Sequence, residues 1–283
     1  MRLHLKICSL IALLIFAFAG RAIGTVMTSY TIDGHVGAEV AAFPSAYGTA
    51  GSGTLNLTLI PAGAVIDRAY LYGNNYFASV TPSATFAGTN LGPTTAYDTN
   101  GGFSVYRWDV TSLITGNGSY AASYTGMTNS YGLALAVVFS DPSLPLSRVL
   151  INDGAFDFYP VPITLSTTFN AFAGSGNLWI HTGADNDGGL GQTGEQIIFN
   201  GTVVGGPIDA NLGPYASLFD LPVTGLNGTN TAEISDPADQ FGWDLAVLKT
   251  PSGGVAPVPE PATMLLLGSG LLGLWGARKK FRK

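Results

Sequence analysis

Few residues of the 283-residue chain have the chemistry of a catalytic group. The chain holds three histidines and a single cysteine, Cys8. It contains no Gly-x-Ser-x-Gly nucleophile elbow, no His-Glu-x-x-His zinc helix and no Gly-x-x-x-x-Gly-Lys-Ser/Thr phosphate loop. His181 follows Trp179 by two positions in a strand-like segment, so we interpret it as a half-buried scaffold residue. We therefore predict no catalytic residue.

One loop combines residue types that bind metal ions. Residues 183–195 place Asp185 and Asp187 at alternate positions of a glycine-rich turn that ends at Glu195. Ca²⁺ takes about six to eight oxygen ligands, and a flexible loop can supply them from carboxylates and carbonyls. The spacing is not that of an EF-hand, and Asp-Asn-Asp-Gly is also a good turn sequence. We predict Asp185, Asp187 and Glu195 as Ca²⁺ ligands, with a turn that binds no metal as the alternative.

Aromatic residues form a second candidate ligand-binding group. Tyr72 and Tyr76 flank Gly-Asn-Asn at 73–75, and Trp179 stands at a similar place later in the chain. Planar rings beside amides can stack on sugars, so these three residues are candidate saccharide-stacking residues. The alternative is that the rings point into the core or stiffen a sheet, because residues two apart on a strand share one face.

Short apolar or alternating runs between turn sequences predict β-strands as the elements that position these residues. The expected strands are 54–60, 65–72, 103–110, 120–124 and 133–139, with a short helical turn at 110–114. Every residue of 133–139 is apolar, which predicts a central strand covered on both faces. We expect an all-β protein whose helical segments occur only in its two terminal signals.

The chain also contains an internal repeat. Four pairs of segments match in order, at offsets that drift from 113 to 110: 86–89 with 199–202, 108–110 with 219–221, 117–119 with 227–229, and 131–138 with 241–248. A drifting offset is typical of duplicated domains with loop insertions, although glycine-rich strands can also match by chance. The alignment places Asp109 on Asp220 and Leu135 on Leu245.

The repeat predicts two duplicated, jelly-roll-like β-sandwich domains, residues 25–160 and 161–253. The join falls near Pro160 and Pro162, because two prolines disfavour a continuous element. The order of strands and turns within 54–250 resembles an uncharacterised β-rich domain family of bacterial and archaeal surface proteins. That resemblance implies a surface protein and brings no catalytic residue with it.

The N-terminus, residues 1–24, has the composition of a secretory signal peptide. Arg2 and Lys6 precede an apolar run at 7–19, and a small-x-small site follows at 22–24. Cleavage after Gly24 removes Cys8. The exported chain is therefore expected to have no thiol, disulfide or cysteine metal ligand.

The C-terminus, residues 254–283, carries three parts in order. Val258, Pro259, Glu260 and Pro261 form an extended motif, because proline disfavours helix. Residues 262–277 follow as an apolar stretch of about 24 Å in helical form, short for a hydrocarbon core of about 30 Å. The last part is a basic tail that stays cytoplasmic.

This order resembles a PEP-CTERM sorting signal. The resemblance implies an exosortase as processing partner, cleavage near Pro259–Pro261, and transient inner-membrane anchoring through the 262–277 span. An ordinary C-terminal membrane anchor is the alternative.

Charge limits the range of partners. Residues 25–257 hold 4 basic and 17 acidic residues, a net charge of −13, although the whole chain carries only −6. Such a charge argues against nucleic acid and anionic membrane surfaces as partners. It is compatible with divalent cations, and a solvated acidic surface explains it equally well.

These features predict a secreted, non-enzymatic protein of the cell surface or extracellular matrix, associated with exopolysaccharide or biofilm. A carbohydrate-binding module is one alternative. A secreted hydrolase is the other, because a glycosidase needs only two suitably separated carboxylates.

Overall fold

The structure, a computed structural model, describes residues 26–76, 79–159, 162–183, 194–208, 216–237 and 241–251. Within these ranges the regular elements are β-strands, apart from the 3₁₀ turn η1 (Thr111–Leu113). The all-β fold is therefore confirmed, and η1 lies in the helical turn predicted at 110–114. Both terminal signals, with their predicted helical segments and the motif at 258–261, lie outside the described residues.

The strands are β1 (Met27–Leu57), β2 (Val65–Tyr76), β3 (Ser83–Phe86), β4 (Thr89–Pro93), β5 (Asp98–Asn100), β6 (Phe103–Asp109), β7 (Gly118–Ser140), β8 (Leu146–Asp157), β9 (Ile163–Gly183), β10 (Gln196–Phe199), β11 (Thr202–Gly205), β12 (Ala216–Asp236) and β13 (Gly242–Pro251). They pair in the order β11-β10-β12-β9-β13-β8-β1-β7-β2-β6-β5, and the β3–β4 hairpin joins β7. Every pairing is antiparallel.

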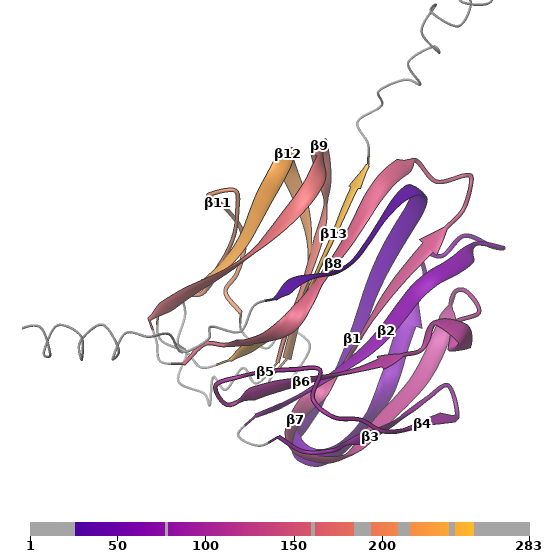
Figure 1. The fold of residues 1–283 in the computed structure, drawn as a ribbon, viewed down its shortest axis with the longest axis vertical. Helices are drawn as coiled ribbons and strands as arrows, with labels where there is room; N and C mark the ends of the chain where they lie inside the picture. Colours follow the sequence, from indigo (N-terminus) through magenta and orange to yellow (C-terminus); the bar gives the residue numbers. More distant parts are fainter. Residues whose placement is uncertain are drawn as a thin grey trace, which may run out of the picture.

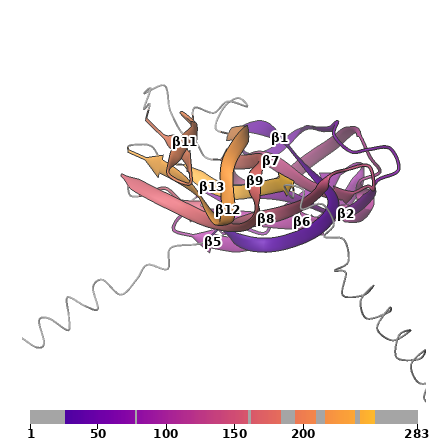
Figure 2. The ribbon, with the colours of Figure 1, turned by 90° about the horizontal axis from the view of Figure 1, so that it is seen from above.

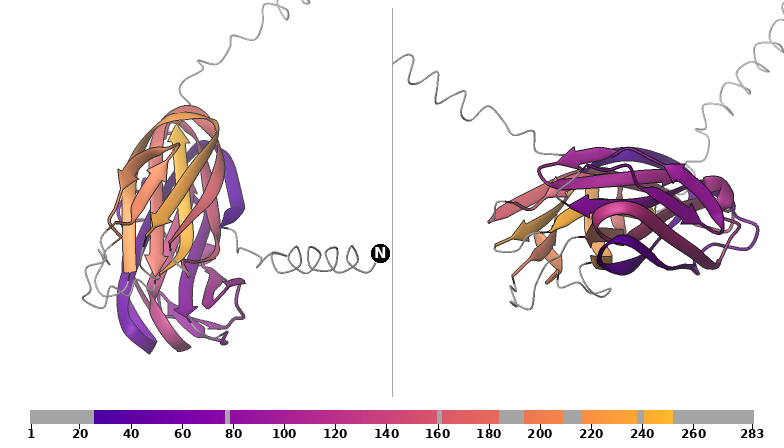
Figure 3. Two further views of the ribbon diagram at one scale, coloured as in Figure 1. Left: turned by 90° about the vertical axis from the view of Figure 1, so that its left-hand side faces the viewer. Right: turned by 90° about the horizontal axis from the view of Figure 1, so that it is seen from below.

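The strands form two groups in space. Strands β1 to β7 lie together in Figure 1, from indigo to magenta, and we call them the first half. Strands β8 to β13 form the second half, in which β9, β11 and β12 lie farthest from β2. Seen from above, β11 of the second half lies at one end of an elongated body and β2 of the first half at the other (Figure 2), and the end view places the salmon-to-yellow strands in front of the indigo ones (Figure 3).

Residues 133–139 of β7 form the predicted central strand. They pair with β1 on one side and β2 on the other, and all seven are buried. Because successive side chains of a strand point to opposite faces, one set packs with Leu71 and the other with Ile151. The prediction of a strand covered on both faces is confirmed.

Three hydrophobic clusters result from this arrangement. The first-half core contains Leu71, Phe86 and Leu135, and the second-half core contains Phe199 and Trp243. The third cluster joins side chains of both halves, and we call it the interface core. It contains Val36, Val40, Tyr72, Tyr76, Phe103, Val105, Ala134, Ala136, Val138, Val149, Ile151, Trp179, Leu245 and Val247.

The two halves share a pairing pattern at their hairpins. In the first half Phe86 pairs with Ala122, and in the second half Phe199 pairs with Ala232. The turns that follow these strands begin with Ala87 and Asn200, both at a φ of 49°. A positive φ is uncommon outside glycine, so the same unusual turn occurs at both matched positions.

A second correspondence joins the long strands. Tyr70 pairs with Asp109 in the first half, and Trp179 pairs with Asp220 in the second. The side chains agree as well, since Arg68 binds Asp109 and Asn177 binds Asp220. The register therefore matches the predicted placement of Asp109 on Asp220.

The predicted placement of Leu135 on Leu245 is one residue out of register. Leu135 pairs with Leu71 and belongs to the first-half core, whereas Leu245 pairs with His181 and belongs to the interface core. The cause is an irregularity between Trp243 and Leu245, which leaves Asp244 as an extra residue of β13 relative to β9. Ala246, in the second-half core, is the counterpart of Leu135.

Strand β8 connects the halves. It pairs with β1 of the first half and β13 of the second, although residues 146–157 precede the predicted join. Pro160 lies outside the described residues. The division into domains at 25–160 and 161–253 thus stays a prediction.

The central strand generates a stability prediction. Leu135→Ala is expected to lower the free energy of unfolding by about 2 to 5 kcal/mol, because it leaves a cavity among fully buried side chains. Leu146→Ala is the matched control, and at 48% exposure it should change stability by about 0.5 kcal/mol or less. Urea unfolding measures both, and equal losses would contradict the assignment of β7 as the central strand.

Candidate functional site

A buried carboxylate, that of Asp153, adjoins the interface core through Tyr72. Asp153 of β8 accepts hydrogen bonds from the hydroxyl of Tyr72 at 2.6 Å and from that of Tyr97 at 2.9 Å. The guanidinium of Arg107 lies 2.8 Å from the same carboxylate. Burying an unpaired charge costs free energy, so these three groups of the first half compensate the burial of Asp153.

Arg107 is itself held between two rings. Its guanidinium carbon lies 3.7 Å from the ring centre of Tyr97 and 4.4 Å from that of Tyr70. Burial opposes the charge of Arg107, but Asp153 raises its pKa above the usual value. Burial and Asp153 also raise the pKa of Tyr97 to about 12, and they raise that of Tyr72 well above its ordinary value.

A second carboxylate joins the halves through the extra residue of β13. Asp244 Oδ1 lies 2.7 Å from His181 Nδ1, and Oδ2 accepts a hydrogen bond from Asn74 Nδ2 at 2.9 Å. A carboxylate only accepts hydrogen bonds, so the facing nitrogen of His181 carries a proton. All three side chains are buried, and no described residue is a hydrogen-bond partner of His181 Nε2.

A third carboxylate, Asp157, accepts hydrogen bonds from the hydroxyl of Tyr76 and from the backbone N–H of Gly102. It lies at the end of β8 and, like Asp153, binds groups of the first half. The three aspartates are thus held by short, specific contacts between strands. This arrangement suits a structural role, because a general acid or base must reach a substrate.

The structure places the candidate stacking residues inside the protein. Tyr72, Tyr76 and Trp179 are 0%, 2% and 4% exposed, and all three belong to the interface core. Their side chains are therefore packed mainly against protein, and little of their surface is open to a sugar. The alternative interpretation, that the rings point into the core, describes their position.

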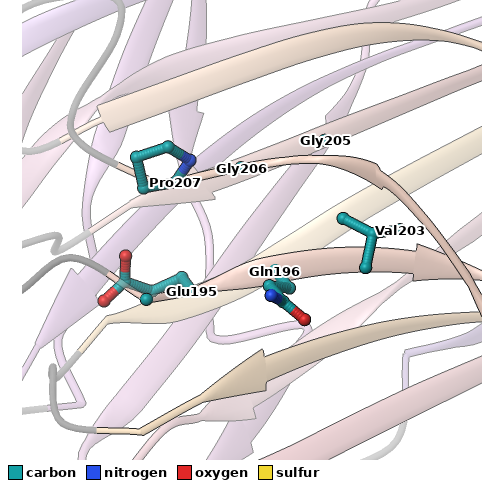
Figure 4. Close-up of a pocket in the computed structure, with 7 residues that line it drawn as sticks. Glu195, Gln196, Val203, Gly205, Gly206 and Pro207 are labelled. Carbon is teal, nitrogen blue, oxygen red and sulfur yellow. The ribbon is translucent and has the colours of Figure 1, made fainter.

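The predicted Ca²⁺ loop lies mainly outside the described residues. Asp185 and Asp187 fall in the range 184–193, so their arrangement is not described. Glu195 is described and is 2% exposed. It lines a hollow of about 320 Å³ together with Gln196, Val203 and Pro207 (Figure 4). The part of the chain that the structure describes holds no group of three metal-binding side chains, and the Ca²⁺ site stays a prediction.

Sequence reasoning missed Asp153, Asp244 and Arg107. One signal was present, since Asp244 interrupts the apolar run at 243–248 and Asp153 with Asn152 interrupts the one at 149–156. A charged residue in such a run predicts either an edge position or a buried ion pair. Their partners lie 46 and 63 residues away along the chain, so the pairing depends on the fold.

The two arginine pairs generate a matched stability prediction. Arg107→Met is expected to lower the free energy of unfolding by about 3 kcal/mol, because it leaves the Asp153 charge buried with only two hydroxyl donors. Arg68→Met removes an exposed pair with Asp109 and should cost about 1 kcal/mol or less. Urea unfolding measures both losses. Equal costs would show that Asp153 does not depend on Arg107.

Tyr97 generates a pH prediction. A tyrosine in the unfolded chain ionises near pH 10, whereas Tyr97 in the folded protein ionises near pH 12. The raised pKa stabilises the fold fully below pH 10, and this stabilisation is lost as the pH rises from about 10 to 12. Tyr97→Phe should therefore lose less unfolding free energy than the wild type between pH 9 and pH 11.5. Equal losses of unfolding free energy in the two proteins over this pH range would refute the raised pKa of Tyr97.

Comparisons with known proteins agree with the two sequence resemblances. Residues 257–283 match the PEP-CTERM protein-sorting motif, which indicates an extracellular protein sorted by an exosortase. Among the described residues, no helix is long and apolar enough to cross a membrane. No curated protein matches the chain.

Solved structures offer only remote similarity. A conserved protein of unknown function from Pseudomonas aeruginosa PAO1 is 11% identical, with a TM-score of 0.32 over 81% of this chain and 90% of that one. The ectodomain of ANX2 from Arabidopsis thaliana is 8% identical, with a TM-score of 0.27 over 75% of this chain and 83% of that one. Residues 20–250 match the family described as Protein of unknown function (DUF3344), and since this match spans most of the chain, the protein belongs to that family.

Proposed function

We propose that this protein is a non-enzymatic component of the extracellular surface that associates with exopolysaccharide. The observation that carries the proposal is the state of its reactive groups. Asp244 is held by His181 and by Asn74 of the first half, and Asp153 is held by Arg107 of the first half. These pairs support a role in holding the halves together rather than in turning over a substrate.

The route to the surface is the second part of the proposal. An exosortase cleaves near Pro259–Pro261 while the apolar span 262–277 anchors the chain transiently in the inner membrane. The match of 257–283 to the sorting motif supports this order of events. The exported product then consists of the two halves and a short tail.

A carbohydrate-binding module is the second candidate function. A cleft of about 470 Å³ between the halves favours it, because ligand pockets typically fall between about 300 and 1,000 Å³. The cleft is lined by both polar and apolar residues. The two candidate functions are compatible, because a protein that binds carbohydrate can also be a component of an exopolysaccharide matrix.

Export and association are tested together in a host that has the exosortase and makes the polysaccharide. Mass spectrometry of the secreted protein should find a C-terminus near Glu260, and the protein should sediment with the polysaccharide fraction. The polysaccharide should show no new reducing ends after incubation with the purified protein.

A polysaccharide-deficient strain and an exosortase-deficient strain are the controls. The first should release processed protein into the soluble fraction, and the second should retain the full-length chain. Secreted protein that still carries Leu265 to Lys283, or that stays soluble when polysaccharide is present, would contradict the proposal.

A further inference from the structure

The cleft between the halves has an unusual combination of side chains. On the second half, Asn177 and Trp179 of β9, Asp220 of β12 and Lys249 of β13 line it. Leu59 and Phe139 of the first half close the opposite side. We call this hollow the Lys249 cleft.

The sheet register explains why these side chains converge. Asn177 pairs with Lys249 on one neighbouring strand, and Trp179 pairs with Asp220 on the other. Residues 177 and 179 share a face because side chains alternate along a strand. The amide of Asn177, the carboxylate of Asp220 and the amine of Lys249 therefore lie on one surface, together with the mostly buried indole of Trp179.

Among the residues that the structure describes, Lys249 has no counterion. It is half-buried, and burial lowers its pKa below the ordinary value. No carboxylate of the described residues lies within 4.0 Å of its amine. An anionic group bound in the cleft would compensate this partly desolvated charge.

The neighbouring polar pair suits hydroxyl groups. Asn177 donates a hydrogen bond to Asp220 Oδ1 at 2.8 Å, and no described residue donates one to Asp220 Oδ2. The amide carbonyl and the second carboxylate oxygen can therefore accept hydrogen bonds from a ligand. Acceptors side by side fit a molecule with adjacent hydroxyls.

The repeat supplies an internal comparison. At the matching place in the first half, Arg68 binds Asp109 and lies over Tyr70, and Val138 stands where the second half has Lys249. In the first half, the carboxylate of Asp109 is thus already paired with a cation of the protein, Arg68. Asn177 is shorter and neutral, so it gives its partner Asp220 no positive charge, and the cation of this surface is Lys249.

We infer that the Lys249 cleft binds an acidic sugar unit, one that carries a carboxylate beside adjacent hydroxyls. Lys249 pairs with the carboxylate, and Asp220 with Asn177 accepts hydrogen bonds from the hydroxyls. The cleft volume of about 470 Å³ suits one or two sugar units. This inference rests on the proposed association with exopolysaccharide and names the chemical class that the protein recognises.

Calorimetric titration of the mature secreted protein tests the inference. The probes are trimers of galacturonate, glucuronate and mannuronate, each compared with the neutral trimer of the matching sugar. At least one acidic trimer should bind ten or more times more tightly than its neutral counterpart. Lys249→Met should lower the affinity for that acidic trimer at least tenfold. It should leave the affinity for the neutral trimer within twofold of the wild-type value.

Two further variants distinguish the cleft from general effects of charge or folding. Asp220→Asn should lower the affinity for the acidic trimer. Arg68→Met, at the matching place of the first half, should leave that affinity within twofold of the wild-type value. Unfolding midpoints show whether each variant is folded. Failure of all three acidic trimers to bind, or equal effects of Lys249→Met and Arg68→Met, would overturn the inference.

The proposed function can fail independently. If Lys249→Met still sediments fully with the polysaccharide, the association stands and the cleft is not its basis. If the wild-type protein binds an acidic trimer but never sediments with polysaccharide, the cleft stands and the matrix role is refuted.

Discussion

Asp153 lies on β8 beside the interface core, where Arg107 and two tyrosine hydroxyls of the first half bind its buried carboxylate. Burying that charge without partners would oppose the packing of the two halves. The surrounding apolar side chains of β7, β8 and β13 can meet only where this contact also forms. The ion pair therefore fixes how the halves pack, and burial of the apolar side chains drives their association.

The same constraint supports the proposal that the protein is non-enzymatic, because it engages the reactive side chains in contacts within the fold. Asp244 sits at the irregularity in β13, which turns it toward His181 and Asn74. Asp157 is held by Tyr76 and by the backbone of Gly102. We propose that these groups serve to hold the fold together rather than to act on a substrate. The Lys249 cleft differs because its amine has no such partner among the described residues.

Much of the fold could be predicted from local sequence. The all-apolar run at 133–139 predicts a strand covered on both faces, and Phe-Ala-Gly-Thr predicts the same hairpin as Phe-Asn-Gly-Thr. The interface core could not be predicted in this way. Alternation shows that Tyr70 and Tyr72 share a face, but it does not show whether that face meets solvent or another sheet.

The candidate sites show the same limit. The inserted residue Asp244 shifts the repeat by one position, and a constant offset hides it because runs of small and apolar residues match acceptably in either register. Lys249 appears in the sequence as a single basic residue near the end of a strand. Its position facing Asn177, with no counterion among the described residues, follows only from the pairing of β9 with β13.

The central claim is that the interface core joins both halves into one cooperative unit. Differential scanning calorimetry of the mature protein tests this claim most directly, because independent domains melt separately. A single transition, with equal calorimetric and van't Hoff enthalpies, is the predicted result. Two resolved transitions, or a calorimetric enthalpy about twice the van't Hoff value, would contradict it.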